Sequence, residues 1–347
     1  MKILITGGLG FIGSHICLEL LKSDNEIIIL DSLVNSSKNK YITLLNLEKK
    51  FSKKFIGNIR LVEGDLRNES LLENLFLKES KESKPINAVI HCAGLKSVGE
   101  SINNPIEYWD INVSGSINLF RVMNKFNCKN LIFSSSATIY SKENNIPLKE
   151  DANFKPVNPY GSTKLTIESI LEDIYYSSPT EWRICNLRYF NPIGAHDSGL
   201  IGEDPKDVPN NIFPLIQKVA AKELPKLTIY GDDWETNDGT CIRDYIHIMD
   251  LAEGHIIGLN YLLKESPQII SFNLGTGIGT SVLQLINTFE KVNKVNIPYI
   301  IGNRRKGDLP NVIADNTKSK KILNWTPKRN IEDMCKDGWN WQLNNIL

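Results

Sequence analysis

The sequence predicts an α/β protein, with a doubly wound parallel-sheet domain and a smaller mixed α/β domain. Short apolar segments alternate with helical stretches through the first half, as in parallel sheets covered by helices on both faces. Parallel crossovers are right-handed, so a doubly wound sheet is the natural topology. After Tyr189 a loop-rich segment, Asn191–Asn211, is full of Gly, Pro, Asp and Asn. We expect domains at 1–190 and 191–347, with about 239–279 returning to the first.

Seven strands are predicted from short apolar runs rich in β-branched residues and bounded by polar or turn-forming residues. The expected strands are Lys2–Thr6, Glu26–Asp31, Ile59–Glu63, Ala88–His91, Asn130–Ser134, Arg183–Tyr189 and Ile269–Leu274.

The segments between the early strands differ in character. Ile12, Ile16 and Leu20 repeat at helical spacing, so a helix should follow the first strand. Residues 35–58 have the character of a partly helical insertion. Its charged run, Glu48–Lys54, is expected in a surface loop as a solvated face.

Composition excludes several classes of protein. The chain has 347 residues, 41% of them hydrophobic, which is enough for a large core. Its formal net charge is zero, so we expect no nucleic-acid partner. No apolar run approaches the ~20 residues that span a bilayer, so no membrane association is expected. A strand that begins at Lys2 would leave no room for a signal or transit peptide, and we expect a cytoplasmic protein.

The cysteines and histidines point to neither disulfides nor metal. The six cysteines are widely spaced, and Cys17, Cys92 and Cys185 lie in apolar segments where buried free thiols are common. This pattern favours a reducing compartment. The five histidines form no HExxH motif and no Cys/His pairing, so we expect no metal site.

A glycine turn follows the first strand. It reads Gly7-Gly8-Leu9-Gly10-Phe11-Ile12-Gly13, which fits Gly-x-x-Gly-x-x-Gly or Gly-x-Gly-x-x-Gly. Such glycines permit a tight strand-to-helix turn and let the backbone approach a pyrophosphate at the helix N-terminus. The motif is weak alone, but a strand precedes it and a helical pattern follows. The sequence therefore predicts a dinucleotide-binding (Rossmann) domain.

Asp31 ends the second predicted strand, 21 residues after Gly10. A carboxylate at this place accepts hydrogen bonds from ribose hydroxyls and repels a 2′-phosphate, which favours NAD over NADP. The alternative is a helix or turn cap before Ser32.

Other strand ends are also candidates for the cofactor site, because a doubly wound fold binds its ligand at the carboxyl ends of the strands. A turn role is an equal alternative for each of them. These candidates are Asp65, Leu66, Cys92, Ala93, Gly94 and Asn112.

Two later segments can supply a base for alcohol oxidation. Ser136 lies in the cluster that ends the strand from Asn130, and Tyr160 and Lys164 are one helical turn apart. A free tyrosine has a pKa of about 10, so its phenolate costs ~4 kcal/mol at neutral pH, and Lys164 would lower that cost. With 11 tyrosines, about one Tyr-x-x-x-Lys is expected by chance, so a solvated helix face is the alternative. Ser134 and Ser135 compete with Ser136 for the hydrogen bond to substrate.

Across almost its whole length the chain resembles the extended short-chain dehydrogenase/reductase superfamily and, within it, the family of UDP-glucose (UDP-galactose) 4-epimerases. The matches occur in one order, which makes the resemblance specific. The matching stretches are Thr6–His15, Ala93–Ser101, Phe133–Thr138, Pro159–Lys164, Leu187–Pro192, Val208–Asn211, Ile242–His247 and Arg304–Pro310.

The resemblance implies a reaction. Tyr160 would take the 4′-hydroxyl proton of UDP-glucose or UDP-galactose while hydride passes from C4′ to bound NAD. The 4-ketopyranose would rotate, and hydride would return to its other face. The resemblance also implies a homodimer, formed through helices that flank the first domain.

The resemblance also assigns binding residues. Arg243 and Arg305 would hold the pyrophosphate and Asp308 a ribose, although structural ion pairing is the alternative for each arginine. For the cofactor it adds Lys96, Ser134, Tyr160, Lys164 and Tyr189. For the UDP-sugar it implies Lys96, Ser136, Tyr160, Asn191, Asn211, Ile212, Tyr230, Arg243, Arg305, Asp308 and Val312.

Departures from related proteins refine the expectation. Related 4,6-dehydratases carry an Asp-Glu pair where this chain has Ala137 and Thr138, which disfavours a dehydratase. Val312 stands where many bacterial relatives have a tyrosine, so UDP-N-acetylglucosamine and UDP-N-acetylgalactosamine are expected to fit as well. Two alternatives stay open: an epimerase or reductase for another nucleotide sugar, and a non-catalytic NAD-binding sensor or scaffold.

Overall fold

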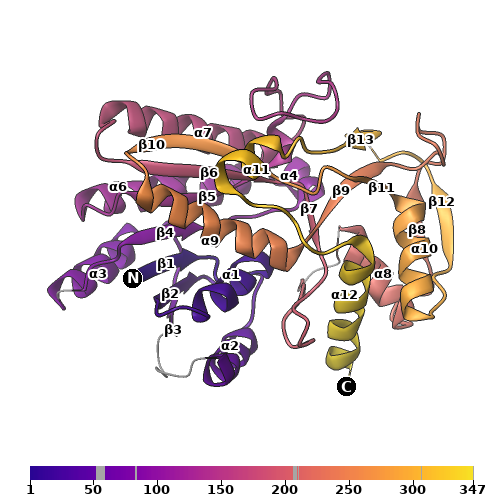
Figure 1. Cartoon of the computed structure of the whole chain (residues 1–347), viewed down its shortest axis with the longest axis horizontal. Helices are drawn as coiled ribbons and strands as arrows, with labels where there is room; N and C mark the ends of the chain where they lie inside the picture. The colour runs from indigo at the N-terminus through magenta and orange to yellow at the C-terminus, as the bar shows by residue number, and fades with distance from the viewer. Residues whose placement is uncertain (52–58, 83, 206–208, 210, 306, 347) are drawn as a thin grey trace. The chain divides into compact units, whose positions relative to one another are not determined.

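The computed structural model describes residues 1–51, 59–82, 84–205, 209, 211–305 and 307–346 (Figure 1). Val208 and Asn210 of one matching stretch lie outside these ranges, as do residues 52–58 of the insertion. The chain forms two compact units. Unit 1 comprises residues 1–139, 156–188 and 252–272, and unit 2 comprises residues 140–155, 189–251 and 273–347.

These units divide the chain differently from the expected boundaries at 1–190 and 191–347. The segment 140–155 belongs to unit 2, where Leu148 forms a β-bridge with Ala314 and the Asn273 amide donates to the Leu148 carbonyl. The returning segment is 252–272, which is shorter than 239–279, because β9 (Ile242–His247) pairs with strands of unit 2.

A seven-stranded sheet forms the centre of unit 1, in the order β10-β6-β5-β4-β1-β2-β3. β1 pairs in parallel with β2 and β4, β2 with β3, and β4 with β5. The chain moves outward from β1 through β2 and β3, then returns to the other side of β1, which confirms the doubly wound prediction. The strands are β1 (Lys2–Thr6), β2 (Glu26–Asp31), β3 (Ile59–Glu63), β4 (Ala88–His91), β5 (Asn130–Ser136), β6 (Arg183–Tyr189) and β10 (Gln268–Leu274).

Helices cover both faces of this sheet (Figure 1). Apolar residues of α3 (Glu69–Lys81), α6 (Gly115–Lys125) and α7 (Pro159–Ser177) form one buried cluster with Leu4, Val89 and other strand residues. A Cβ on Gly258 of α9 (Ile248–Lys264) would lie 3.8 Å from the Ile132 and Cys185 side chains. α1 (Phe11–Leu21) follows the first strand as predicted. Because both faces of the sheet are covered, consecutive residues of a strand can all be apolar.

The prediction of a surface loop at Glu48–Lys54 was wrong for its first residues, while 52–54 lie outside the described ranges. α2 (Lys38–Phe51) includes Glu48, which is only 1% exposed. Leu44 and Leu47 are also buried, at helical spacing with Glu48. This apolar stripe determines a helix despite the charged composition.

Unit 2 is a mixed α/β unit centred on β9. β9 pairs in parallel with β7 (Asn191–Ile193) and β13 (Asn311–Val312), and antiparallel with β11 (Gly279–Ser281). A separate parallel pair consists of β8 (Leu227–Tyr230) and β12 (Tyr299–Gly302). Its helices are α8 (Ile212–Ala220), α10 (Val282–Asn293), α11 (Thr317–Leu323) and α12 (Ile331–Ile346). Their core includes Phe213, Ile216, Tyr245, Phe289 and Met334.

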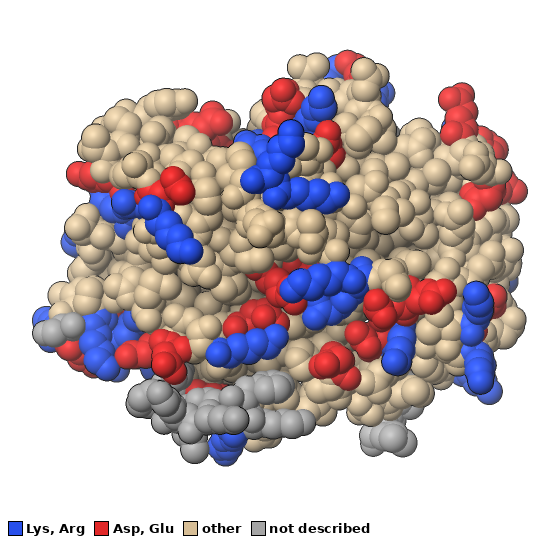
Figure 2. Space-filling model, viewed as in Figure 1, with Lys and Arg blue, Asp and Glu red and all other residues tan. Residues whose placement is uncertain are grey.

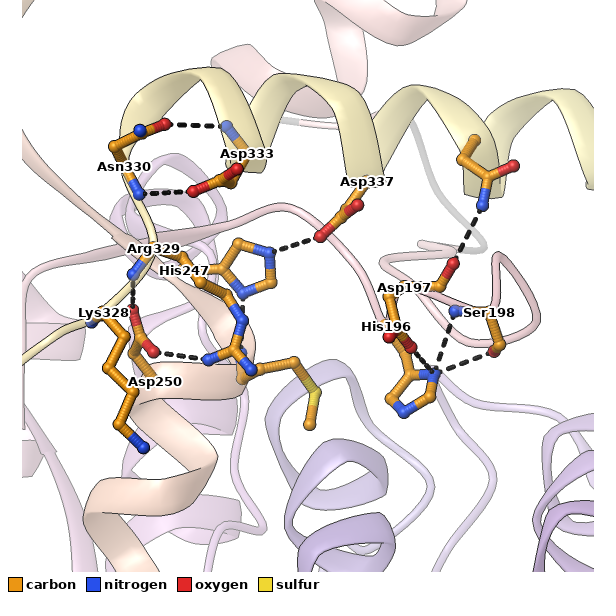
Figure 3. Close-up of polar contacts among 12 residues, drawn as sticks. His196, Asp197, Ser198, His247, Asp250, Lys328, Arg329, Asn330, Asp333 and Asp337 are labelled. Atoms are coloured by element: carbon orange, nitrogen blue, oxygen red, sulfur yellow. Dashed lines mark hydrogen bonds and ion pairs between the residues drawn. The ribbon is translucent and has the colours of Figure 1, made fainter. Parts of the chain in front are cut away.

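Polar contacts anchor α12 within unit 2 (Figure 3). The His247 ring lies 3.2 Å from the Asp337 carboxylate, and the Asn340 amide donates to the Asp197 carbonyl. Before the helix, the buried Asp250 carboxylate accepts hydrogen bonds from Arg329. The last helix is thereby fixed to β9 and to the loop after β7.

Basic and acidic side chains are interspersed on the face seen in Figure 2. All six cysteines are free thiols. Within the described ranges, no helix has the length and apolar character needed to cross a bilayer. The same residues contain no cluster of three or more His, Cys, Asp or Glu side chains suited to a metal ion.

Candidate active site

The glycine turn between β1 and α1 is tightly packed. Gly7 has φ +66°, and a Cβ there would lie 2.8 Å from the Ala93 backbone. A Cβ on Gly13 would lie 2.3 Å from the Gly7 carbonyl oxygen. At Gly10, the N-cap of α1, a Cβ would meet only that same oxygen, at 3.2 Å. Gly7 and Gly13 thus permit the turn itself, while Gly10 leaves space in front of the helix N-terminus, where backbone N–H groups favour an anion.

Asp31 is buried at the end of β2. Its carboxylate accepts hydrogen bonds from the Leu9 and Leu33 backbone N–H groups, both at 2.9 Å, and from the Ser36 hydroxyl at 2.7 Å. The turn-capping alternative is therefore present in the structure. The same contacts fix the carboxylate beside the glycine turn, where it can still accept a further bond.

Asp65 and Leu66 follow β3 and have structural partners. Asp65 binds Arg67, which also binds Asp110, and the hydrogen bond from Arg67 lowers the pKa of Asp65. Leu66 is buried, and a Cβ on Gly115 would lie 3.1 Å from it. Both residues lie at the carboxyl end of β3, as predicted.

Asn112 connects the loop after β4 to α7. Its side chain accepts from the Leu95 N–H at 2.8 Å and donates to the Leu95 carbonyl and to Thr163. It lies in a π-helical turn, Trp109–Ser114, a geometry that often occurs at functional sites. Gly94 has φ +151°, and Lys96 in the same loop is exposed. Cys92 and Ala93 directly follow β4, where burial raises the pKa of the Cys92 thiol to about 11.

The three serines at the end of β5 have different partners. The Ser134 hydroxyl donates to the Cys92 sulfur, and the Ser135 hydroxyl donates to Glu168. Ser136 accepts hydrogen bonds from the Thr138 N–H and hydroxyl, and it lies close enough to Tyr160 to lower the pKa of that phenol. Of the three, Ser136 is the serine that faces the tyrosine.

Tyr160 and Lys164 lie one turn apart on α7, as predicted. The buried Lys164 ammonium donates to the Ser134 carbonyl at 2.8 Å and lies 5.9 Å from the centre of the Tyr160 ring. Burial lowers the pKa of Lys164 to about 8. Burial raises the pKa of Tyr160, and the hydrogen bond with Ser136 opposes that rise. The causes of this shift do not include the expected lowering by Lys164, whose ammonium is directed at the Ser134 carbonyl.

The arginine assignments fall in unit 2. Arg243 on β9 donates to the Leu309 carbonyl at 2.7 Å and lies 3.7 Å from Asp308. Arg305 binds the same carboxylate at 3.0 Å, and its guanidinium lies 5.6 Å from the Tyr230 ring. Structural ion pairing is therefore observed, and the same contacts bring two guanidinium groups to one place.

The remaining assignments lie at element ends in unit 2. Tyr189 ends β6, Asn191 begins β7, and Ile212 begins α8. The Asn211 amide donates to Glu203 at 3.2 Å. Val312 pairs with Arg243 in the β13–β9 register.

Comparisons with known proteins show which family the chain belongs to. A family model described as GDP-mannose 4,6 dehydratase matches residues 4–338. A bifunctional UDP-glucose 4-epimerase and UDP-xylose 4-epimerase from Pisum sativum is 47% identical over 345 residues, covering 99% of this chain and 96% of its own. A UDP-glucose 4-epimerase from Bacillus subtilis is 45% identical over 346 residues, covering 100% and 98%. The chain belongs to the UDP-glucose 4-epimerase family.

A solved structure of this family has the same fold. The UDP-glucose 4-epimerase from Bifidobacterium longum, in complex with NAD+ and UDP, aligns with a TM-score of 0.92. It is 43% identical, and the alignment covers 100% of this chain and 99% of that one.

Sequence reasoning missed two buried charges near Tyr160 and Lys164. Glu168 and Arg188 are 2% and 3% exposed and form a bidentate ion pair, with distances of 3.0 and 2.7 Å. The available signal was spacing, because Tyr160, Lys164 and Glu168 repeat at every fourth position. Arg188 comes from β6, so no local pattern could pair it with Glu168.

Proposed function

We propose that this chain interconverts UDP-glucose and UDP-galactose by transient oxidation at C4′ with bound NAD. Membership of the UDP-glucose 4-epimerase family supports the reaction class. The observation that carries the proposal is the arrangement of Ser136, Tyr160 and Lys164. The serine hydroxyl lowers the pKa of the tyrosine, and the buried ammonium lies 5.9 Å from the centre of the same ring. A dehydratase is disfavoured, because Ala137 and Thr138 have no carboxyl group for acid/base chemistry at C5′ and C6′.

The residues of unit 1 fit a dinucleotide. Gly10 leaves open space before the N-terminus of α1, and Asp31 is fixed beside that turn. A carboxylate at this place favours NAD over its 2′-phosphorylated form. NAD, when bound, supplies the hydride acceptor for C4′ and returns the hydride to the opposite face. The residues that would hold it are Gly7, Gly10, Phe11, Ile12, Gly13, Asp31, Asp65, Leu66, Cys92, Ala93, Gly94, Lys96, Asn112, Ser134, Tyr160, Lys164 and Tyr189.

Tyr160 is the proposed base. It removes the proton from the 4′-hydroxyl and gives it back when the sugar is reduced again. At neutral pH a tyrosine with the ordinary pKa of about 10 ionises at a cost of ~4 kcal/mol, and burial adds to this cost here. The hydrogen-bond contribution of Ser136 offsets part of it. We propose that the positive charge of Lys164, 5.9 Å from the centre of the ring, stabilises the phenolate further. Ser136 can pass the proton between sugar and phenol because a hydroxyl both donates and accepts.

The UDP-sugar residues proposed in unit 2 centre on Asp308. Arg243 and Arg305 both approach its carboxylate. Guanidinium groups bind phosphate oxygens in the same geometry as carboxylates, so the two arginines suit a pyrophosphate. The full proposed substrate set is Lys96, Ser136, Tyr160, Asn191, Asn211, Ile212, Tyr230, Arg243, Arg305, Asp308 and Val312.

We also propose that UDP-N-acetylglucosamine and UDP-N-acetylgalactosamine are substrates. Val312 is half-buried in β13 beside Arg243, which is one of the proposed pyrophosphate ligands. A valine occupies less volume than the tyrosine of many bacterial relatives, which leaves room for a 2′-acetamido group.

We propose a cytoplasmic homodimer. The six free thiols fit a reducing compartment. Apolar side chains are exposed on consecutive helices of unit 1: Ile102 on α4 (Val98–Asn103), Ile106 on α5 (Pro105–Tyr108) and Ile117 on α6. Ile106 is 82% exposed, so Ile106→Glu should shift sedimentation from dimer to monomer without lowering the melting temperature. Unchanged sedimentation would contradict this surface.

The deciding experiment is turnover by purified protein with no NAD added. Conversion of UDP-galactose to UDP-glucose would support the epimerase with a retained cofactor, and conversion of UDP-N-acetylgalactosamine would support the wider substrate range. Tyr160→Phe should abolish most turnover while NAD stays bound. If wild-type protein converts neither sugar even with NAD added, the epimerase proposal fails, and an NAD-binding sensor or another nucleotide sugar becomes the better reading.

A further inference from the structure

Ser135 lies on the α7 face of β5. Side chains alternate between the faces of a strand, so Ser135 continues the row of Leu131 and Phe133. Both of those residues pack in the buried cluster that includes Ile167 of α7. A hydroxyl in this row is buried and needs a hydrogen-bond partner. Glu168 of α7 supplies it.

Glu168 is held by a second partner. Arg188 on β6 donates to both of its carboxylate oxygens, with Nε 3.0 Å from Oε1 and Nη2 2.7 Å from Oε2. All three side chains of this cluster, Ser135, Glu168 and Arg188, are at least 97% buried. A buried ion pair contributes little to stability compared with apolar packing of the same volume. Its bidentate geometry does fix the direction of the carboxylate.

Three successive residues of β5 therefore contact α7. The Phe133 ring lies 4.9 Å below the Lys164 ammonium, and the Ser134 carbonyl accepts a hydrogen bond from that ammonium. The Ser135 hydroxyl then contacts Glu168, one turn beyond Lys164. Ser136, the next residue, is the one that faces Tyr160.

We propose that Glu168 is a positioning residue: oriented by Arg188, it holds Ser135 and so fixes where Ser136 meets the Tyr160 hydroxyl. Glu168 does not touch substrate in this scheme and acts only through β5. The inference rests on the proposed epimerase function for its kinetic consequence. Its structural consequence, the environment of the Tyr160 hydroxyl, can be measured without any sugar.

Ser135→Ala tests the link while leaving the Arg188–Glu168 ion pair in place. We expect kcat for UDP-galactose to fall about tenfold with KM within about twofold, because the change misplaces reacting groups and leaves the ground-state contacts unchanged. Glu168→Gln should lower kcat in the same way. Its amide replaces one acceptor oxygen with an NH2 donor, which would face an Arg188 N–H and break the bidentate contact that orients the side chain.

The matched control is Ser319→Ala. Ser319 in α11 is also fully buried and donates to a backbone carbonyl, that of Asn316, at 2.9 Å. It lies in unit 2, outside the proposed machinery, so turnover should equal that of wild type.

A second readout is the pH titration of the Tyr160 hydroxyl. It is obtained by subtracting the ultraviolet absorbance of the Tyr160→Phe version from that of each protein at every pH. The midpoint should rise in Ser135→Ala, because a displaced Ser136 stabilises the phenolate less. Other groups facing this place stay unchanged in that variant. They are His91 on β4, Cys92 directly after it, Lys164 and Glu172 on α7, and the Glu168–Arg188 pair itself.

The two readouts separate this inference from the proposed function. A wild-type protein without turnover would end the epimerase proposal, while a raised Tyr160 midpoint in Ser135→Ala would still support the positioning role. Wild-type kcat and midpoint in Ser135→Ala would overturn it. So would a rise of KM at constant kcat, or a Glu168→Gln protein with unchanged kcat.

Discussion

The buried Lys164 should make folding stability depend on pH in a measurable way. Its ammonium lies under the end of β5, where it donates to the Ser134 carbonyl and contacts the Phe133 ring. Burial disfavours the charged form and lowers its pKa from 10.5 to about 8. Lys164→Met keeps an unbranched apolar stem and removes the charge, so it isolates this contribution.

The magnitude follows from the pKa difference. One pH unit is worth about 1.4 kcal/mol, so the fall from 10.5 to about 8 corresponds to roughly 3 kcal/mol of lost stability. Below about pH 8 both states hold the proton, and this cost is fully present. Between about pH 8 and 10.5 only the unfolded chain holds it, so the free energy of unfolding rises with pH. Above 10.5 the amine is neutral in both states, and the cost disappears.

Urea denaturation of wild type and Lys164→Met across this range, with equal cofactor content, measures the effect. The difference in free energy of unfolding, wild type minus Lys164→Met, should increase by roughly 3 kcal/mol between pH 7 and 10.5. The lost hydrogen bond to Ser134 shifts the difference at every pH and leaves its slope unchanged. Lys125→Met, at an exposed lysine of α6, is the control for loss of a surface charge. A constant difference between wild type and Lys164→Met would refute the reasoning.

Three further predictions concern other residues of the chain. Gly13→Ala should lower the free energy of unfolding by about 3 kcal/mol, because its Cβ would lie 2.3 Å from the Gly7 carbonyl oxygen. Gly10→Ala should keep the melting temperature but lose bound NAD. Equal losses of stability in the two variants would contradict this distinction. Val312→Tyr should abolish turnover of the UDP-N-acetylhexosamines and keep turnover of UDP-galactose. Equal losses of turnover on both kinds of substrate would contradict the proposal that Val312 leaves room for a 2′-acetamido group. Asp244→Asn should lower the free energy of unfolding, measured by urea denaturation, by about 3 kcal/mol. The buried carboxylate accepts hydrogen bonds from three backbone N–H groups, and an amide cannot accept all of them. A loss under about 1 kcal/mol would show that the backbone around Asp244 rearranges.

The sheet could be predicted from the sequence because its strands carry a local signal. Five predicted strands have the observed bounds, since an apolar run ends at a polar or turn-forming residue in each. β5 was predicted to end at Ser134 but extends to Ser136. The serines were interpreted as the end of the strand because nothing local supplies partners for buried hydroxyls. Their partners are Cys92, directly after β4, and Glu168 on α7.

The candidate site could be predicted only in part, for the same reason. Spacing within a single segment was enough to identify Gly7, and likewise Tyr160 with Lys164. The structure adds that Ser136 lies near Tyr160. Charge pairing depends on the fold, so the partners of Arg243 could not be foreseen. Asp65 is the contrasting case, because its partner Arg67 is only two positions later and was present in the local sequence.

The polar groups of unit 1 explain why stability and the proposed activity should oppose each other. The carboxyl ends of β1, β4 and β5 converge at the switch point of the sheet, where a ligand crevice forms. Polar groups gathered there lose water and need protein partners. Ser135, Glu168 and Arg188 satisfy one another, but Lys164 keeps a charge in an environment that disfavours it. Replacing that charge should stabilise the fold near neutral pH and remove the electrostatic support for the Tyr160 phenolate. A Lys164 variant that is more stable than wild type and keeps full turnover would contradict the role proposed for Lys164, because stability would then have increased without loss of activity.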